Sequence, residues 1–90
     1  MLPEAVTICG MKYTVKEVDD RLWDNWGKVE HHIQRISIDK TATQEQKEIV
    51  LLHEVIHTIM TQSLAIIKHD EQLITCLSNG IWATGYRINI

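Results

Sequence analysis

The sequence predicts an α+β fold: a small antiparallel sheet of about four strands packed on two helices. Two periodicities carry this prediction. In the first half of the chain, apolar and polar residues alternate as they do in half-buried strands. In the second half, apolar residues recur every three or four positions, as on a helix. The 90 residues, 44% of them hydrophobic, are enough for one modest core, so we expect a single domain over residues 1–90.

The first half divides into two pairs of predicted strands. Residues 5–9 and 11–18 are β-like runs, in which Val6, Ile8 and Tyr13 have polar neighbours. Gly10 lies between these runs and predicts the turn of a hairpin. Residues 27–32 and 34–39 form the second pair. The link between them lacks an Asn-Gly turn, so the sequence leaves its register open.

The second half contains two predicted helices. A helix over residues 44–61 is indicated by a set of apolar residues at helical spacing: Ile49, Leu52, Ile56 and Ile59. Thr43 and Gln46 fit a capping box at its start. A second helix is expected over residues 70–84, with a buried stripe made of Leu73, Ile74, Leu77 and Ile81. Gly85 suits its C-terminal end, while residues 63–69 are ambiguous.

The segment His-Glu-Val-Ile-His at residues 53–57 reads H-E-x-x-H, the zinc-binding signature of metallopeptidases. On a helix, His53 and His57 project from one face, one turn apart, and can together hold one Zn²⁺. Glu54 lies about 100° round the helix from His53 and can reach a water on that metal. The competing interpretation is a solvated helix that merely carries these residues. Apolar Leu51 and Leu52 before the motif, and Val55 and Ile56 within it, argue against full exposure.

A catalytic zinc usually has three protein ligands and a water, so a third ligand must come from elsewhere in the chain. Asp70 and Glu71 open the second predicted helix, and His69 precedes them. His31 and His32 on an earlier strand are further candidates, or substrate-binding residues. Periodicity leaves the choice open, because an acid in the first turn of a helix is favourable without any metal.

The pattern L-L-H-E-x-x-H at residues 51–57, followed by E-x-x-I-x-x-L-S-N-G at residues 71–80, resembles small phage and prophage members of the ImmA/IrrE-type zinc metallopeptidases. Residues 8–18 and 36–39 resemble the opening hairpin and the strand before the active-site helix of such proteins. The resemblance implies a minimal zincin-like fold of the gluzincin type. In that family a Glu on the following helix is the third ligand, and this position falls on Glu71.

The resemblance therefore implies a zinc-dependent metallo-endopeptidase with one Zn²⁺ per chain. Its metal ligands would be His53, His57 and Glu71, and Glu54 would activate the attacking water. A regulatory protein in a phage or prophage context is the expected substrate. The zincin architecture also implies that residues 34–39 form a free sheet edge that aligns an extended peptide.

Two alternatives remain open at this point. The metal could be a non-catalytic staple in a small zinc-stabilised module, in which case loss of Glu54 would cost no function. The chain could also be a metal-free phage interaction or inhibitor protein, with Trp23 and Trp26 exposed on its surface. Zinc stoichiometry separates the last alternative from the other two readings, and a Glu54→Gln variant separates an enzyme from a staple.

Composition argues against several other classes of protein. Nine Lys and Arg against twelve Asp and Glu give a formal net charge of −3, without a basic cluster for nucleic acid. We find neither a signal peptide nor an apolar run of membrane-spanning length, so a cytoplasmic protein of a bacterial host cell is expected. Cys9 and Cys76 form no disulfide framework and are expected to be reduced small hydrophobes.

Overall fold

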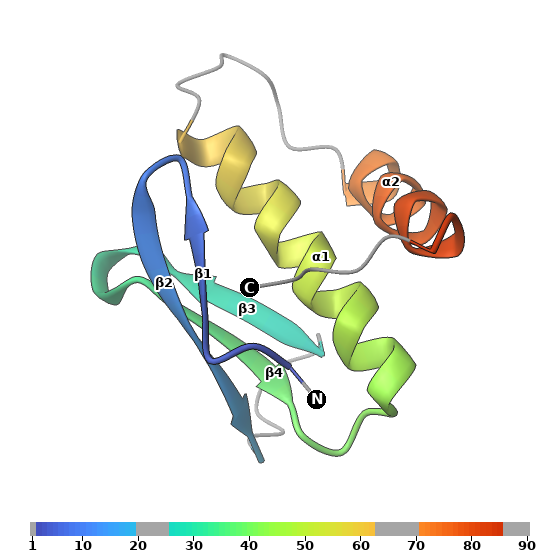
Figure 1. Cartoon of the computed structure of the whole chain (residues 1–90), viewed down its shortest axis with the longest axis horizontal. Helices are drawn as coiled ribbons and strands as arrows, with labels where there is room; N and C mark the ends of the chain where they lie inside the picture. Colours follow the sequence, from blue (N-terminus) through green and yellow to red (C-terminus); the bar gives the residue numbers. More distant parts are fainter. Residues whose placement is uncertain (1, 20–25, 63–70, 86–90) are drawn as a thin grey trace.

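The computed structural model describes residues 2–19, 26–62 and 71–85. The elements are β1 (Ala5–Ile8), β2 (Met11–Val18), β3 (Gly27–Glu30), a 3₁₀ turn η1 (His31–Ile33), β4 (Arg35–Asp39), α1 (Gln44–Gln62) and α2 (Glu71–Ala83). One face of the sheet is covered by α1, and α2 packs against α1 on the side away from the sheet (Figure 1). The α+β class is confirmed, and each predicted strand and helix is present in the described part of the chain, with ends that differ by up to two residues.

The sheet is mixed, so the prediction of an antiparallel sheet is wrong. Its strand order is β1-β2-β4-β3. The two predicted pairs are antiparallel, but β2 and β4 lie side by side and run parallel, from Thr14 opposite Arg35 to Val18 opposite Asp39. The reason is that β3 takes the outer position and β4 returns antiparallel to it, next to β2. Side-chain alternation is the same in either direction and so carries no information on this choice.

Two tight turns end the strands earlier than predicted. Cys9 and Gly10 both have positive φ values, 51° and 81°, as in the two-residue turns that match the twist of a hairpin. The predicted strand over residues 27–32 ends at Glu30, and His31 already belongs to η1. Gln34 leaves this turn with a φ of 50°, and its side-chain amide donates to the Lys12 carbonyl at 2.6 Å.

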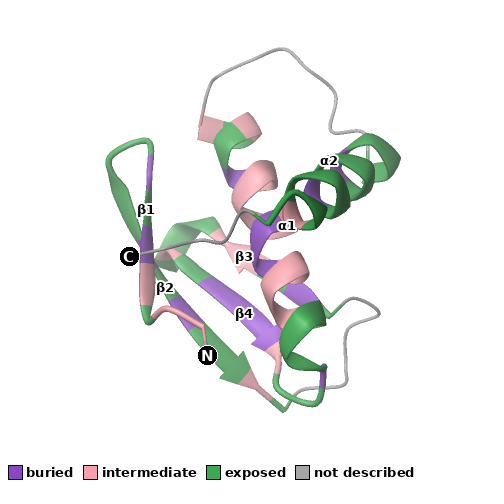
Figure 2. Cartoon of the chain, turned by 45° about the vertical axis from the view of Figure 1, so that its right-hand side comes forward, coloured by how far each residue is buried: buried purple, intermediate pink, exposed green. Residues whose placement is uncertain are grey.

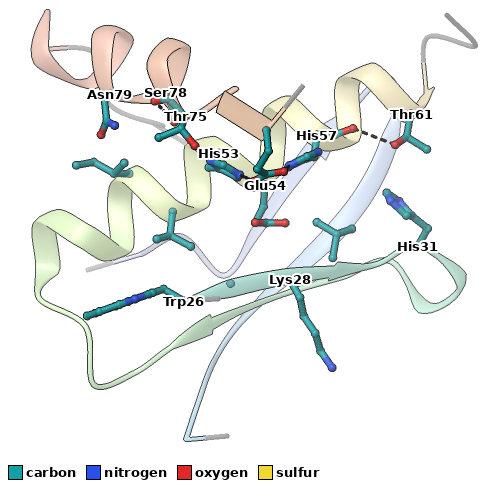
Figure 3. Close-up of a pocket in the computed structure, with 15 residues that line it drawn as sticks. Trp26, Lys28, His31, His53, Glu54, His57, Thr61, Thr75, Ser78 and Asn79 are labelled. Atoms are coloured by element: carbon teal, nitrogen blue, oxygen red, sulfur yellow. Dashed lines mark hydrogen bonds and ion pairs between the residues drawn. The ribbon is translucent and has the colours of Figure 1, made fainter. Parts of the chain in front are cut away.

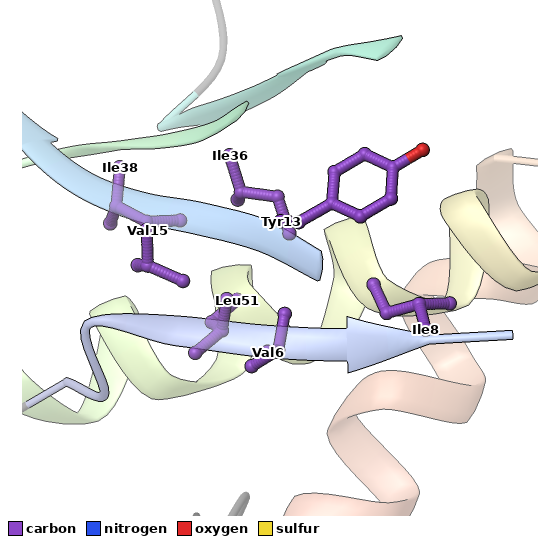
Figure 4. Packing of buried hydrophobic residues seen from close by; sticks show 7 residues of the cluster. All are labelled: Val6, Ile8, Tyr13, Val15, Ile36, Ile38 and Leu51. Atoms are coloured by element: carbon purple, nitrogen blue, oxygen red, sulfur yellow. The ribbon is translucent and has the colours of Figure 1, made fainter. Parts of the chain in front are cut away.

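The core lies between the sheet and α1. Alternate residues of the three strands β1, β2 and β4 point to the same face and meet one leucine of α1 there. The buried cluster consists of Val6, Ile8, Tyr13, Val15, Ile36, Ile38 and Leu51 (Figure 4). At the start of α1, Gln46 N–H donates to the Thr43 hydroxyl at 3.2 Å, which is one of the two hydrogen bonds of the predicted capping box. The Lys47 ammonium also contacts Glu17 of β2 at 2.6 Å.

The predicted buried stripe of α2 is largely exposed. Ile74 is fully buried, whereas Leu73, Leu77 and Ile81 are 52%, 44% and 36% exposed. Figure 2 shows α2 as mostly green, with buried residues only on the side towards α1. Among the described elements, α2 packs mainly on α1. This contact buries a narrower face of α2 than its apolar residues would cover. In α1, Ile59 is likewise 45% exposed.

The remaining predictions about the fold have mixed outcomes. Gly85 follows α2 with a φ of 92°, and its N–H donates to the Trp82 carbonyl at 3.1 Å, which confirms the C-terminal end. Cys9 and Cys76 are free thiols but exposed, so neither is a packed hydrophobe. Trp23 and residues 63–69 lie outside the described residues. Neither described helix combines the length and apolar character that crossing a membrane requires.

Candidate metal centre

Three side chains from two helices converge beside the middle of α1. His53 and His57 lie one turn apart on α1, and Glu71 is the first residue of α2. The distance from His53 Nε2 to Glu71 Oε1 is 2.5 Å, and the distance from His57 Nε2 to Glu71 Oε2 is 2.8 Å. One ligand atom from each residue lies within 4.8 Å of the others. The structure therefore brings together the three residues that the resemblance indicated as metal ligands.

The donor set fits a zinc ion by its chemistry and its spacing. Two imidazole nitrogens and one carboxylate are a ligand set of catalytic zinc sites. Ligand atoms about 2.0–2.2 Å from a tetrahedral ion lie roughly 3.3–3.5 Å from one another. The two distances between an imidazole nitrogen and Glu71 are shorter than this, and the three ligand atoms all lie within 4.8 Å of one another, which is close to the spacing that one ion requires. Both imidazoles are sheltered, with 17% and 18% of their side chains exposed, whereas Glu71 is 67% exposed.

The two histidines lower the pKa of Glu71. Burial acts in the opposite direction and would raise it, but the hydrogen bond with His53 and the charge of His57 hold the pKa below its ordinary value of 4.5. The carboxylate is therefore ionised at neutral pH, as a metal ligand must be. The other candidates for the third ligand have different outcomes. His31 and His32 are outside the three-residue cluster, while His69 and Asp70 lie outside the described residues.

Glu54 lies between the ligand cluster and β3, in a pocket that α1, α2 and β3 line (Figure 3). The pocket is shared with all three ligands and is also lined by Trp26, Gly27, Lys28, Val29, His31, Ile49, Val50, Thr61, Thr75, Ser78 and Asn79. Burial raises the pKa of Glu54 to about 7, with a further contribution from the negative charge of Glu71. A carboxyl group with a pKa near neutrality can both accept and release a proton under ordinary conditions.

Gly27 allows β3 to pass directly beneath Glu54. A Cβ atom at Gly27 would lie 2.4 Å from Val50 Cγ1 and 3.4 Å from Glu54 Cγ, so only glycine fits between the strand and α1. Sequence reasoning assigned no role to this residue. The available signal was weak, since a glycine inside a strand pattern sometimes marks a close approach of another backbone or side chain.

The strand beside the pocket is β3, and not the one predicted. The expectation that residues 34–39 form a free sheet edge is wrong, because β4 is paired on both sides, with β2 and with β3. The edge at this end of the sheet is β3, whose Gly27, Lys28 and Val29 line the pocket. The same strand order that makes the sheet mixed therefore also decides which backbone faces the site.

Comparisons of the chain with models of known protein families, with curated proteins and with solved structures find no match.

Proposed function

We propose that this protein is a zinc-dependent metallo-endopeptidase, with a minimal zincin-like fold of the gluzincin type. One observation carries the proposal: His53, His57 and Glu71 place their ligand atoms within 4.8 Å of one another, in a pocket that also contains Glu54. The resemblance to small ImmA/IrrE-type peptidases points to the same residues. The protein would bind one zinc ion per chain.

The residues of the site have separate roles in this proposal. A zinc ion held by the three ligands would polarise a peptide carbonyl and acidify a water molecule. Glu54 takes a proton from the attacking water and later returns it to the leaving amine, a role that suits its pKa of about 7. The ligands lie on two helices, so the zinc site also holds α2 against α1.

The substrate in this proposal is an extended peptide segment of a protein. The β3 edge can pair with such a segment through backbone hydrogen bonds, with its side chains alternating towards and away from the pocket. Gly27 brings this edge close to Glu54, so that a paired peptide passes the proton acceptor. A regulatory protein in a phage or prophage context is the substrate that the resemblance suggests.

The position of Glu54 favours an enzyme over a non-catalytic zinc staple. A staple needs only the three ligands, whereas a carboxyl group held in a pocket with a raised pKa opposes folding at neutral pH. Such a cost is common for groups that serve catalysis. Trp26, at 45% exposed, fits the alternative of an interaction protein, but it lines the same pocket and is equally placed to contact a peptide substrate.

The first test is the metal content of protein purified without a chelator or a His tag. We expect one zinc per chain in the wild type and none in the His53→Ala and Glu71→Ala variants. The matched controls, His32→Ala and Glu45→Ala, remove an exposed histidine and an exposed glutamate outside the cluster and should retain zinc.

Cleavage of a peptide library by the zinc-loaded protein, read by mass spectrometry, then separates an enzyme from a staple. We expect activity in the wild type and its loss in Glu54→Gln, with zinc retained. A wild type without metal even after zinc is supplied would exclude the peptidase. A zinc-loaded wild type that cleaves no peptide would favour the alternative of a non-catalytic, zinc-stabilised module.

A further inference from the structure

His31 enters the same pocket from the end of β3. It follows the last residue of that strand, and Figure 3 shows its ring rising from the sheet towards α1. On its other side, His31 Nδ1 lies 3.1 Å from the hydroxyl of Tyr13, and the two rings meet edge to face with centroids 6.0 Å apart. One nitrogen of the imidazole is therefore engaged by the core, while the residue itself lines the pocket.

A second hydrogen bond fixes the direction of the first. The side-chain amide of Gln62, at the end of α1, donates from Nε2 to the Tyr13 hydroxyl at 2.9 Å. An amide nitrogen can only donate, so the hydroxyl oxygen accepts there. Tyr13 is 0% exposed, so its own O–H has no water to bond and is directed at His31 Nδ1. Nδ1 is then the acceptor, and the single proton of a neutral imidazole is on Nε2.

The arrangement therefore prepares a hydrogen-bond donor in the pocket. The chain Gln62 → Tyr13 → His31 joins the end of α1, β2 and η1, and it selects one tautomer of His31. The other ionisable residues that line the pocket are the three metal ligands, the proton acceptor Glu54, and Lys28. Figure 3 shows the Lys28 side chain pointing away from the cavity. A peptide offers acceptors of the matching kind, its carbonyl oxygens.

We propose that His31 donates its Nε2–H to the carbonyl oxygen of the peptide bond being cleaved, and that Tyr13 and Gln62 are positioning residues for this donor. The inference rests on the proposed peptidase function and deepens it. As the carbonyl oxygen gains negative charge, a donor that is already oriented stabilises it more than it stabilises the ground state. His31 keeps its proton throughout, so Glu54 remains the group that moves protons.

The tautomer can be tested without any activity. Long-range ¹H–¹⁵N NMR spectra of the full chain, at a pH where the His31 ring is neutral, identify its protonated nitrogen. The His31→Gln variant assigns the signals. We expect the proton on Nε2 in the wild type and a mixture of tautomers in Tyr13→Phe. A wild-type ring with its proton on Nδ1 would overturn the inference, whether or not the protein is a peptidase.

The role in catalysis is tested with a matched set of variants of the zinc-loaded protein. His31→Leu removes the donor and should lower kcat about 100-fold, the order of magnitude for one oxyanion donor, with KM little changed. His31→Gln retains an N–H donor and should recover part of the loss. Tyr13→Phe should lower kcat about tenfold, as expected for a group that orients another. His32→Leu, next to it and also exposed, should behave as the wild type.

The failures of the two proposals are distinguishable. Full activity in His31→Leu, beside an active wild type, would overturn this inference and leave the peptidase in place. A zinc-loaded wild type that cleaves no peptide would overturn both. Zinc content and thermal unfolding of each variant show whether a loss of activity reflects the donor or the fold. If Tyr13 and Gln62 only satisfy each other in the core, Tyr13→Phe changes stability and leaves kcat unchanged.

Discussion

His57 and Glu71 join the two helices of the protein at the candidate metal centre, with 2.8 Å between Nε2 of the imidazole and Oε2 of the carboxylate. Glu71 is the first residue of α2, so this contact fixes the start of the helix against the middle of α1. Further along, α2 is held by buried Ile74 and by the Trp82 indole, which donates to Glu48 at 3.3 Å. A metal at the centre would therefore act on the packing of the helices as well as on chemistry.

We expect zinc to stabilise the fold through this link. At a free zinc concentration 100 times its dissociation constant, the free energy of unfolding should rise by about 2.7 kcal/mol. Thermal unfolding with and without a chelator measures the effect. His53→Ala should unfold at the same temperature in both conditions, whereas the control His32→Ala should keep the shift. An equal shift in His53→Ala would show that zinc binds elsewhere.

The metal-free protein should lose stability as the pH rises through the titration range of Glu54. The pKa of this group is about 7 in the folded protein and 4.5 in its ordinary state, so between these values the folded state holds a proton that the unfolded state has released. Folding stability therefore falls between pH 4.5 and 7, by at most about 3 kcal/mol from this group.

Denaturant unfolding of the wild type and Glu54→Gln across this range, both with chelator, isolates the contribution, because glutamine does not titrate. The stability advantage of the variant should grow with pH. Glu71, whose pKa is lowered, acts in the opposite sense and in a separate window: its contribution is present above pH 4.5 and is lost as the pH falls below that value. A constant difference between wild type and variant would contradict the prediction.

Two apolar residues one turn apart on α2 should differ sharply in their effect on stability, because only one of them is buried. Ile74 is fully buried against α1, so Ile74→Ala should cost about 2–5 kcal/mol of the free energy of unfolding. Leu77 is 44% exposed, and Leu77→Ala should change it by less than about 0.5 kcal/mol. Chemical denaturation measures both variants. Similar costs at the two positions would mean that the outer face of α2 is covered in solution.

Gly27→Ala should disturb the site through packing alone. The added methyl group would lie 2.4 Å from Val50 Cγ1, so β3 and α1 must move apart, at a cost of about 1–3 kcal/mol. Under the proposed function, the displaced strand should also lower kcat/KM without loss of zinc. Gly80→Ala is the matched control, because its Cβ would meet nothing within 4 Å and alanine favours the helix. Equal stability of Gly27→Ala and the wild type would contradict the close approach.

Much of the local structure could be read from the sequence because it depends on short-range periodicity. The alternation around Val6 and Tyr13, with Gly10 between, was enough for the β1–β2 hairpin. The helical spacing of residues 44–61 was enough to put His53 and His57 on one face of a helix. These features follow from contacts between residues a few positions apart, which a pattern in the chain records directly.

The tertiary structure decided what depends on residues far apart in the chain. Strand order made β3 the edge beside the pocket, and alternation gives no information on strand order or direction. The apolar stripe of α2 showed that the helix has a face to bury, but only its packing on α1 decided that Ile74 is covered and Leu77 is not.

The same division runs through the site. The two histidines and Glu54 belong to one helical segment, so their mutual placement was determined by the sequence itself. The meeting of Glu71 with His57, the fit of Gly27 under Glu54 and the hydrogen bonds that orient His31 each join separate elements. Such contacts arise only when the sheet and both helices pack together, because no local backbone preference brings these residues within reach of one another.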